Sequence, residues 1–274
     1  KRAMGLAIHK AKKLGLGMTV VRNSTHYGIA GYYVNMAIEQ GMIGITGTNA
    51  RPSIAPTFGV ENMLGTNPLT FGLPSDEEFP FILDCATSIT QRGKIELYAR
   101  KGKLVPPGWV IDQEGKTQTD PKTILDSLVK GTMALTPLGG IGEEMGGYKG
   151  YGYATVVEIL SAALADGKFL KMLSGYNEKG ERIPYCLGHF FIAINIEAFI
   201  ELEKFKSITG QILRRLRAAK KMPGTHRIDT AGEKEYLAWQ ERKKKGIPLN
   251  QSIQQEIKLM QKAVSYTHLT LPTN

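Results

Sequence analysis

The sequence predicts an α/β fold in which short apolar strands alternate with amphipathic helices. Two features of its apolar residues predict this class. Several apolar or β-branched runs have the length of a strand, and longer segments between them repeat apolar residues at the helical period. A chain of 274 residues, 42% hydrophobic and 22% charged, is long enough for one large or two modest globular domains.

The individual elements are predicted in chain order from the same patterns. Residues 1–14 read as the end of an amphipathic helix, with Met4, Ile8 and Ala11 on its apolar side. His189 begins a strongly apolar strand, where we expect it to be structural. The predicted strands are 18–21, 42–46, 79–83 and 189–194, and residues 65–72 lead into a further strand. The predicted helices are 34–40, 94–98, 154–165, 198–221, 234–245 and 252–263. The predicted loops are 101–121, 168–185 and 222–230.

One histidine, His26, lies where the first strand passes into the next helix, in the sequence Asn-Ser-Thr-His-Tyr-Gly at 23–28. Open α/β sheets place ligands at such joins. An imidazole has the unperturbed pKa, near ~6.5, that best suits proton transfer at neutral pH. The alternative is a capping and turn segment without chemistry, since Asn, Ser, Thr and Gly gather at helix starts. Both interpretations stay open at this point.

An acid, Asp84, ends the strand at 79–83 and is followed by small and hydroxyl residues up to Ser88. This placement is typical of a ligand site. Asp84 or Thr87 would equally serve as the N-cap of the helix at 94–98. Arg51, after the turn at 47–50, would either meet a 2′-phosphate or be an ordinary surface arginine.

The densest glycine cluster, 138–152, contains Lys149 and opens the helix at 154–165. A glycine loop with a lysine at a helix N-terminus is suited to hold a phosphate, although such loops also act as connectors. The spacing Gly-x-Gly-x-x-Gly occurs nowhere, so the usual dinucleotide fingerprint is missing. Gly115-Lys116-Thr117 is not a phosphate loop, because Val110 stands where its first glycine belongs.

The chain is basic, with a formal net charge of +10. A basic nucleic-acid-binding protein is therefore a competing hypothesis, although no recognisable RNA- or DNA-reading module is present. The same charge suits anionic substrates and cofactors. Cys85 and Cys186, in apolar surroundings, predict reduced thiols in a cytoplasmic protein, with no disulfide or metal site. The sequence contains no run of eighteen apolar residues, so it predicts no membrane-spanning helix.

We expect that neither end of the sequence is the natural end of the protein. Residues 264–274 resemble a transposase sequencing adaptor translated in frame, so we exclude them, and His268 with them, from the fold. The chain starts at Lys1 without an initiator methionine, inside a predicted helix, which indicates a truncated N-terminus.

Four segments, in order between about Ala3 and Lys262, together resemble the malate/L-lactate dehydrogenase family. They are residues 23–28, 65–69 (Gly-Thr-Asn-Pro-Leu), 83–88 (Leu-Asp-Cys-Ala-Thr-Ser) and 146–152 (Gly-Gly-Tyr-Lys-Gly-Tyr-Gly). This non-Rossmann group also contains ureidoglycolate, sulfolactate and diketogulonate oxidoreductases. The resemblance implies a family-specific NAD(P)-binding fold with a mixed sheet flanked by helices.

The resemblance also implies the activity and the organisation of the chain. The family interconverts 2-hydroxy and 2-oxo acids by hydride transfer with NAD or NADP, usually as cytoplasmic homodimers, without nucleic acid or membrane partners. Residues 1–20 would be the remnant of an N-terminal helical region. Residues 21–200 would bind the dinucleotide and catalyse the reaction, and 201–263 would form a C-terminal helical region.

Site residues follow from the family motifs, position by position. His26 would be the proton acceptor in some relatives and a cofactor contact in others. Relatives carry an upstream Ser-His-Gly segment and an arginine that do not precede His26 here, so we expect low activity from this chain alone. Ala231 stands where relatives usually have proline. The implied cofactor-binding residues are His26, Tyr27, Gly28, Asn49, Ala50, Asp84, Cys85, Ala86, Lys149, Gly150, Ala231, Gly232 and Glu233, with no metal ligand.

Overall fold

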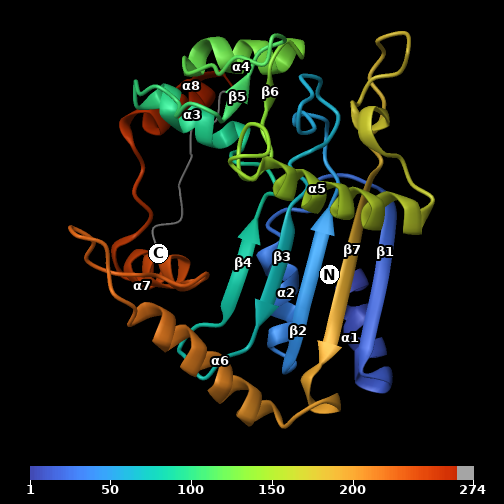
Figure 1. Ribbon diagram of the computed structural model, residues 1–274, viewed down its shortest axis with the longest axis vertical. Coiled ribbons are helices and arrows are strands. Elements are labelled where there is room, and N and C mark those ends of the chain that lie inside the picture. Colours follow the sequence, from blue (N-terminus) through green and yellow to red (C-terminus); the bar gives the residue numbers. More distant parts are fainter. Residues whose placement is uncertain (264–274) are drawn as a thin grey trace. The chain divides into compact units, whose positions relative to one another are not determined.

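The computed structural model describes residues 1–263 and is built around a five-stranded sheet in the order β1-β7-β2-β3-β4 (Figure 1). The α/β class with a helix-flanked sheet is confirmed. The predicted adaptor segment and His268 lie outside the described residues. The strands of this sheet are β1 (Leu16–Ser24), β2 (Met42–Thr48), β3 (Leu69–Leu73), β4 (Phe81–Cys85) and β7 (Leu187–Asn195).

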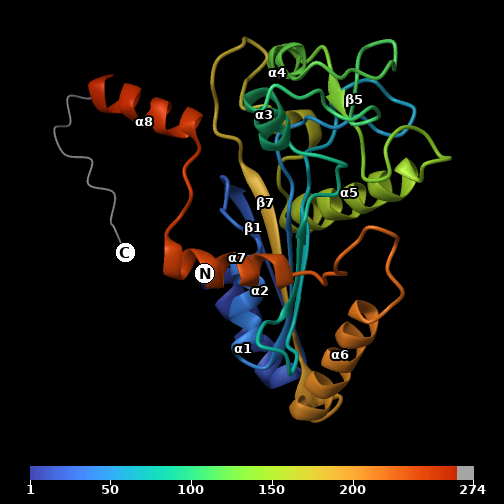
Figure 2. The same ribbon diagram turned by 90° about the vertical axis from the view of Figure 1, so that its left-hand side faces the viewer.

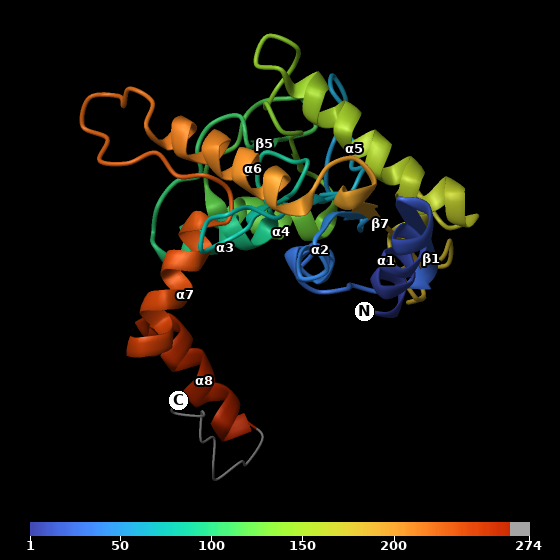
Figure 3. The same cartoon turned by 90° about the horizontal axis from the view of Figure 1, so that it is seen from below.

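Helices cover both faces of the sheet. The helices α1 (Arg2–Leu14) and α2 (Gly31–Ile38) lie on one face, and α5 (Gly147–Ala162) lies on the other (Figures 2 and 3). Apolar side chains fill the space under α1 and α2 and exclude water from it. This core includes Met4, Ala7, Ala37, Met42, Phe191 and Ala193.

Every pair of neighbouring strands in the described sheet is antiparallel, so the expected mixture of strand directions is wrong. The physical reason is that β2, β3 and β4 follow one another with a reversal of direction each time, and that β7 lies between β1 and β2 and runs opposite to both. Residues 74–80, for example, simply turn β3 back into β4. Because directions alternate across the sheet, β1, β2 and β4 end at the same edge.

A second small core lies beyond this edge in Figure 1 and contains a two-stranded sheet. Residues 101–121, predicted as loop, include its strand β5 (Val110–Ile111), and its partner is β6 (Ala134–Leu135). The helix α4 (Pro121–Lys130) was not predicted, although Asp120 caps it by accepting a hydrogen bond from the Thr123 N–H at 2.8 Å. The helix α3 (Arg92–Arg100) packs with α4 around Ile95 and Ile124.

The helix α5 begins at Gly147, seven residues before the predicted start at 154. A Cβ on Gly147 would lie 2.1 Å from the Gly140 carbonyl oxygen, and one on Gly150 would lie 2.3 Å from that of Leu138. The glycines therefore let the first two turns of α5 pack directly on the backbone of the preceding loop. On the outer face of α5 the apolar side chain of Val156 is 48% exposed.

The chain divides into two compact units, Lys1–Ile212 and the part from Leu213 onward. The second unit contains the end of α6 (Leu202–Arg217), then α7 (Glu233–Lys245) and α8 (Gln251–Ala263). No helix in the described range is long and apolar enough to cross a membrane. Three short 3-10 turns complete the first unit: η1 (Ala163–Ala165), η2 (Leu170–Leu173) and η3 (Ile196–Ala198).

Candidate active site

A cavity of about 380 Å³ lies at the edge where β1, β2 and β4 end. It is formed by the segment between β1 and α2, the residues after β2, and the end of β4, so segments far apart in the sequence meet there. Seven of the residues implied by the family motifs line it: His26, Tyr27, Gly28, Asn49, Ala50, Asp84 and Ala86.

The carboxylate of Asp84 is held in place by two donors. Its Oδ2 accepts a hydrogen bond from the Gly31 N–H at 2.7 Å, and its Oδ1 accepts one from the Thr70 hydroxyl at 3.1 Å. Gly31 is the first residue of α2, so a negative charge lies at the positive end of that helix. Asp84 thereby ties the end of β4 to the segment that carries His26.

The prediction that Asp84 or Thr87 caps the next helix is wrong. The N-cap of α3 is Gln91, and its side chain makes no capping hydrogen bond. Thr87 instead donates its hydroxyl proton to the carbonyl oxygen of Asn67 at 2.9 Å. The three residues between Cys85 and Ile89 are too far from the helix start to reach its first N–H groups.

The imidazole of His26 is exposed, and its Nδ1 accepts a hydrogen bond from the Gly28 N–H at 3.1 Å. A ring nitrogen that accepts a hydrogen bond carries no proton of its own, so the neutral ring of His26 holds its proton on Nε2. Nε2 is therefore the atom of His26 that is available to donate to a ligand.

A buried aromatic stack supports the backbone beside His26. The ring of Tyr27 stacks on His189 with centroids 4.5 Å apart, and on Tyr33 at 4.9 Å. His189 is 2% exposed, and its Nδ1 lies 2.6 Å from the Thr48 hydroxyl. The structural role expected for His189 is confirmed. Burial lowers the pKa of His189 to about 4, so its ring is neutral near pH 7.

The pKa of His189 predicts a pH dependence of stability. Its folded-state pKa lies below the ordinary value of 6.5, so protons bind the unfolded chain more readily. The free energy of unfolding should therefore fall as the pH falls from about 6.5 toward 4, losing about 1 kcal/mol between pH 7 and pH 5.5. Urea unfolding at both pH values measures this loss. A His189→Phe variant with the same pH dependence as the parent chain would contradict the assignment.

The residues at the end of β2 are fixed by the protein itself. The side chain of Asn49 is fully buried, accepts a hydrogen bond from the Gly188 N–H at 2.8 Å and donates to the Lys168 carbonyl at 3.2 Å. The N–H of Ala50 donates to Oδ1 of Asn67 at 3.2 Å. These contacts leave the methyl group and carbonyl of Ala50 as its groups that can face a ligand.

A second hollow, of about 460 Å³, adjoins the first and shares five lining residues with it: His26, Ala50, Thr66, Gln91 and Leu187. Arg51 and Arg92 line this hollow. Sequence reasoning missed Gln91 and Arg92, although a polar and a basic residue directly before a predicted helix were a usable signal.

A sequence model described as malate/L-lactate dehydrogenase matches residues 1–258. The chain belongs to the malate/L-lactate dehydrogenase family. It is 46% identical over 263 residues to malate dehydrogenase from Pyrococcus horikoshii, covering 96% of this chain and 70% of that protein. It is 38% identical over 224 residues to L-sulfolactate dehydrogenase from Methanocaldococcus jannaschii, covering 82% and 60% of the two chains.

Solved structures of malate/L-lactate dehydrogenase relatives share the fold. The crystal structure of malate dehydrogenase from Entamoeba histolytica has a TM-score of 0.90 at 48% identity, over 98% of this chain and 74% of that chain. The structure of malate dehydrogenase from Pyrococcus horikoshii has a TM-score of 0.81 at 42% identity, over 98% and 71%. The antiparallel sheet described above is therefore the family's fold.

A dehydrogenase of this family uses a nicotinamide cofactor, and the first hollow fits such a group. The hollow is lined by small residues that leave room for a flat ring: Gly28, Ala30, Ala50 and Ala86. A Cβ on Gly28 would meet no atom within 4 Å, so the backbone there is open to close approach. Apolar walls with a few fixed polar groups are what cofactor sites commonly offer.

Three of the residues implied by the family motifs occupy other positions in the first unit. Cys85 is half-buried and its thiol contacts the Leu69 carbonyl at 3.9 Å; burial, and less so the charge of Asp84, raises its pKa. Lys149 lies in the first turn of α5 with its Nζ 5.6 Å from the centre of the Tyr148 ring. Neither these residues nor Gly150 is among those that line the two hollows.

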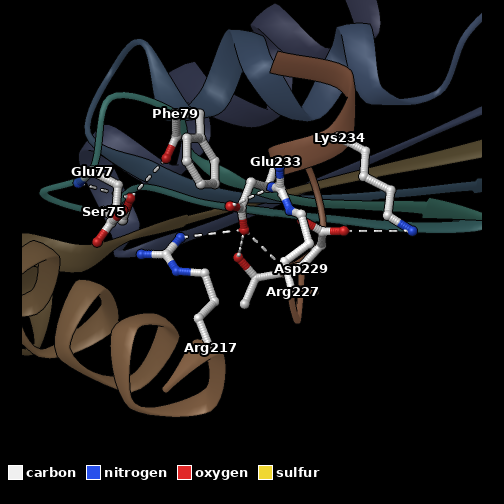
Figure 4. A network of polar contacts seen from close by, with 9 residues as sticks. Ser75, Glu77, Phe79, Arg217, Arg227, Asp229, Glu233 and Lys234 are labelled. Carbon is white, nitrogen blue, oxygen red and sulfur yellow. Dashed lines mark hydrogen bonds and ion pairs between the residues drawn. The ribbon is translucent and has the colours of Figure 1, made fainter. Parts of the chain in front are cut away.

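The remaining three, Ala231, Gly232 and Glu233, belong to the second unit. Glu233 starts α7, and Figure 4 shows its carboxylate between Arg217 and Arg227. Its Oε1 lies 2.9 Å from Nη2 of Arg227, and its Oε2 accepts a hydrogen bond from the Thr230 N–H at 3.1 Å. The Glu233 side chain is only 14% exposed, so these contacts order the start of the helix.

Proposed function

We propose that this chain is an NAD(P)-dependent oxidoreductase that interconverts a 2-hydroxy acid and a 2-oxo acid of the malate type. The observation that carries the proposal is the convergence of His26, Ala50 and Asp84 on one cavity, in a chain 46% and 45% identical to two malate dehydrogenases. L-Sulfolactate is the next candidate substrate, because the chain is 38% identical to an L-sulfolactate dehydrogenase. Ureidoglycolate and diketogulonate, which only the resemblance to the family implies, follow it. Dinucleotide binding and catalysis are assigned to 21–200, beside the terminal regions 1–20 and 201–263.

In this proposal the His26 imidazole exchanges a proton with the substrate oxygen on C2. When bound, the cofactor supplies hydride exchange between its nicotinamide C4 and carbon C2 of the acid. The carbonyl oxygen gains negative charge as C2 is reduced, and Nε2–H of His26 donates a hydrogen bond to it. Full transfer of this proton starts from the doubly protonated ring, whose Nδ1–H no longer accepts from Gly28, and leaves the neutral ring. In the reverse direction Nε2 must accept the proton, which requires the neutral ring to give up the hydrogen bond from Gly28.

The other residues of the cavity orient and exclude water. Asp84 holds the start of α2 and thereby the turn at Gly28. Ala50 and Ala86 provide apolar contacts, and Tyr27 fixes the backbone of its neighbour His26 through its stack on His189. Whether NAD or NADP is preferred is left to the binding experiment, since one relative is named an NADP(+) enzyme.

The function is tested by titrating the protein into NADH and into NADPH and recording the nicotinamide fluorescence. We expect saturable binding of at least one of them, followed by oxidation of the bound cofactor on adding oxaloacetate. A gel-shift assay with DNA and RNA runs in parallel, because the net charge of +10 also suits nucleic acid. Salt-dependent nucleic-acid binding without any nicotinamide signal would overturn the proposal.

We further propose that the protein is a homodimer in the cytoplasm. Exposed apolar side chains on α5, namely Tyr153 (57%), Val156 (48%) and Ile159 (53%), form a surface of the kind that a partner subunit covers. Cys85 and Cys186 are both unpaired, which suits a reducing compartment.

Light scattering should give twice the chain mass for the parent protein, and Ile159→Asp should shift it toward the monomer because a buried unpaired charge is costly. Lys204→Gln, which lowers the net charge by the same one unit at an exposed position on α6, should leave the dimer intact. A monomeric parent chain at micromolar concentration would contradict the dimer.

A further inference from the structure

The second hollow carries two positive side chains and begins at His26. Arg51 is the third residue after β2, and Arg92 is the first residue of α3. No Asp or Glu is among the described residues that line the hollow. Two guanidinium groups without a carboxylate between them form a site for an anion.

The guanidinium groups retain capacity for a ligand. Arg92 uses its Nε to bind Oε1 of Glu96 at 3.0 Å, and its side chain is 42% exposed. Arg51 is exposed and forms no ion pair with any residue of the described chain. Neither arginine is therefore neutralised fully by the protein.

The helix start adds to the same charge. The first N–H groups of a helix have no acceptor within it, and the Gln91 side chain does not cap those of α3. The positive end of the helix dipole thus lies beside Arg92. A Cβ on Gly93 would meet nothing within 4 Å, so this end of the helix is open.

The position of the hollow identifies its occupant. Of the cavity residues that the family motifs imply for the cofactor, Gly28, Asp84 and Ala86 line the first hollow and not the second, whereas His26 and Ala50 line both. Since His26 lines both, a substrate that reacts beside His26 would extend into the second hollow. A substrate with a single acid group would leave two guanidinium groups facing one negative charge.

We propose that Arg51 and Arg92 determine specificity by binding a second acidic group of the substrate, a carboxylate or a sulfonate, carried beyond the reacting carbon. This inference rests on the proposed function and adds to it the two residues that select a 2-oxo or 2-hydroxy acid with two acidic groups over one with a single acidic group. The apolar side chains of Leu128 and Leu135, on the wall of the same hollow, limit water and strengthen such contacts.

The test compares Arg51→Gln and Arg92→Gln with the parent protein in two assays. Each variant should lower kcat/KM for oxaloacetate by about 10- to 100-fold, the range expected for one charge-assisted hydrogen bond, and that for pyruvate by less than about threefold. Calorimetry without any turnover should show the same loss of affinity for hydroxymalonate and no change for glycolate. Lys94→Gln, which removes a charge from α3 outside the hollow, is the control and should behave as the parent.

Each other outcome has a defined meaning. Equal losses for oxaloacetate and pyruvate would overturn the inference, and so would unchanged binding of hydroxymalonate. A selective loss of NADPH affinity, with substrate preference unchanged, would assign the arginines to a 2′-phosphate and overturn it as well. Failure of the parent protein to bind either nicotinamide cofactor would instead refute the proposed function, which the fluorescence titration detects separately.

Discussion

Replacing His26 by alanine is expected to lower kcat for oxaloacetate reduction by about 10²–10⁴-fold, the usual contribution of a positioned acid or base. The structural reason is that Nε2 is the only ring atom left free after Nδ1 accepts the Gly28 N–H at 3.1 Å. Single-turnover measurements with bound NADH separate this loss in the chemical step from changes in binding.

The control for this experiment is His9→Ala, because His9 is an exposed histidine on α1 away from either hollow. It should keep the parent kcat. A His26→Ala variant with normal kcat and only a weakened affinity for NADH would assign His26 to cofactor contact, the second role that the family motif implies.

Much of the candidate site was predictable because its signals are local. The turn at 23–28, the acid Asp84 and the small residues after each strand show in the sequence without any knowledge of the fold. The strand direction was not predictable in this way. An apolar run of four or five residues reads the same whether its neighbour runs parallel or antiparallel, so the mixed sheet came only from resemblance.

Two other differences have a non-local cause. One of the two interpretations of Asp84 made it the N-cap of the helix that follows it in sequence, but its partner Gly31 is 53 residues earlier. The start of α5 was missed because glycine is a poor helix former, and the backbone contact that favours it at Gly150 depends on how the preceding loop folds back to place Leu138 against the helix. Both effects depend on tertiary packing, which overrides local propensity.

The role of the glycine cluster can be tested by two substitutions of opposite sign. Gly150→Ala is expected to lower the free energy of unfolding by about 2–3 kcal/mol, because its Cβ would lie 2.3 Å from the Leu138 carbonyl oxygen and 2.4 Å from the Leu138 nitrogen. Those contacts are with backbone, so α5 or the loop must shift. Gly152→Ala, two residues along the same helix, meets no atom within 4 Å and should raise stability by about 0.5–1 kcal/mol.

Urea unfolding of the protein without cofactor decides the matter, since neither substitution then acts through a ligand. A phosphate-holding loop with no packing role would instead let both variants gain about 0.5–1 kcal/mol from helix propensity and would weaken NADH binding in Gly150→Ala alone. If Gly150→Ala is destabilised as expected, the glycine is required by the approach of α5 to the residues before it. The neighbouring residue Lys149 would then be positioned by that packing. An NADH titration of Lys149→Gln would show whether the lysine charge contributes to cofactor binding as well.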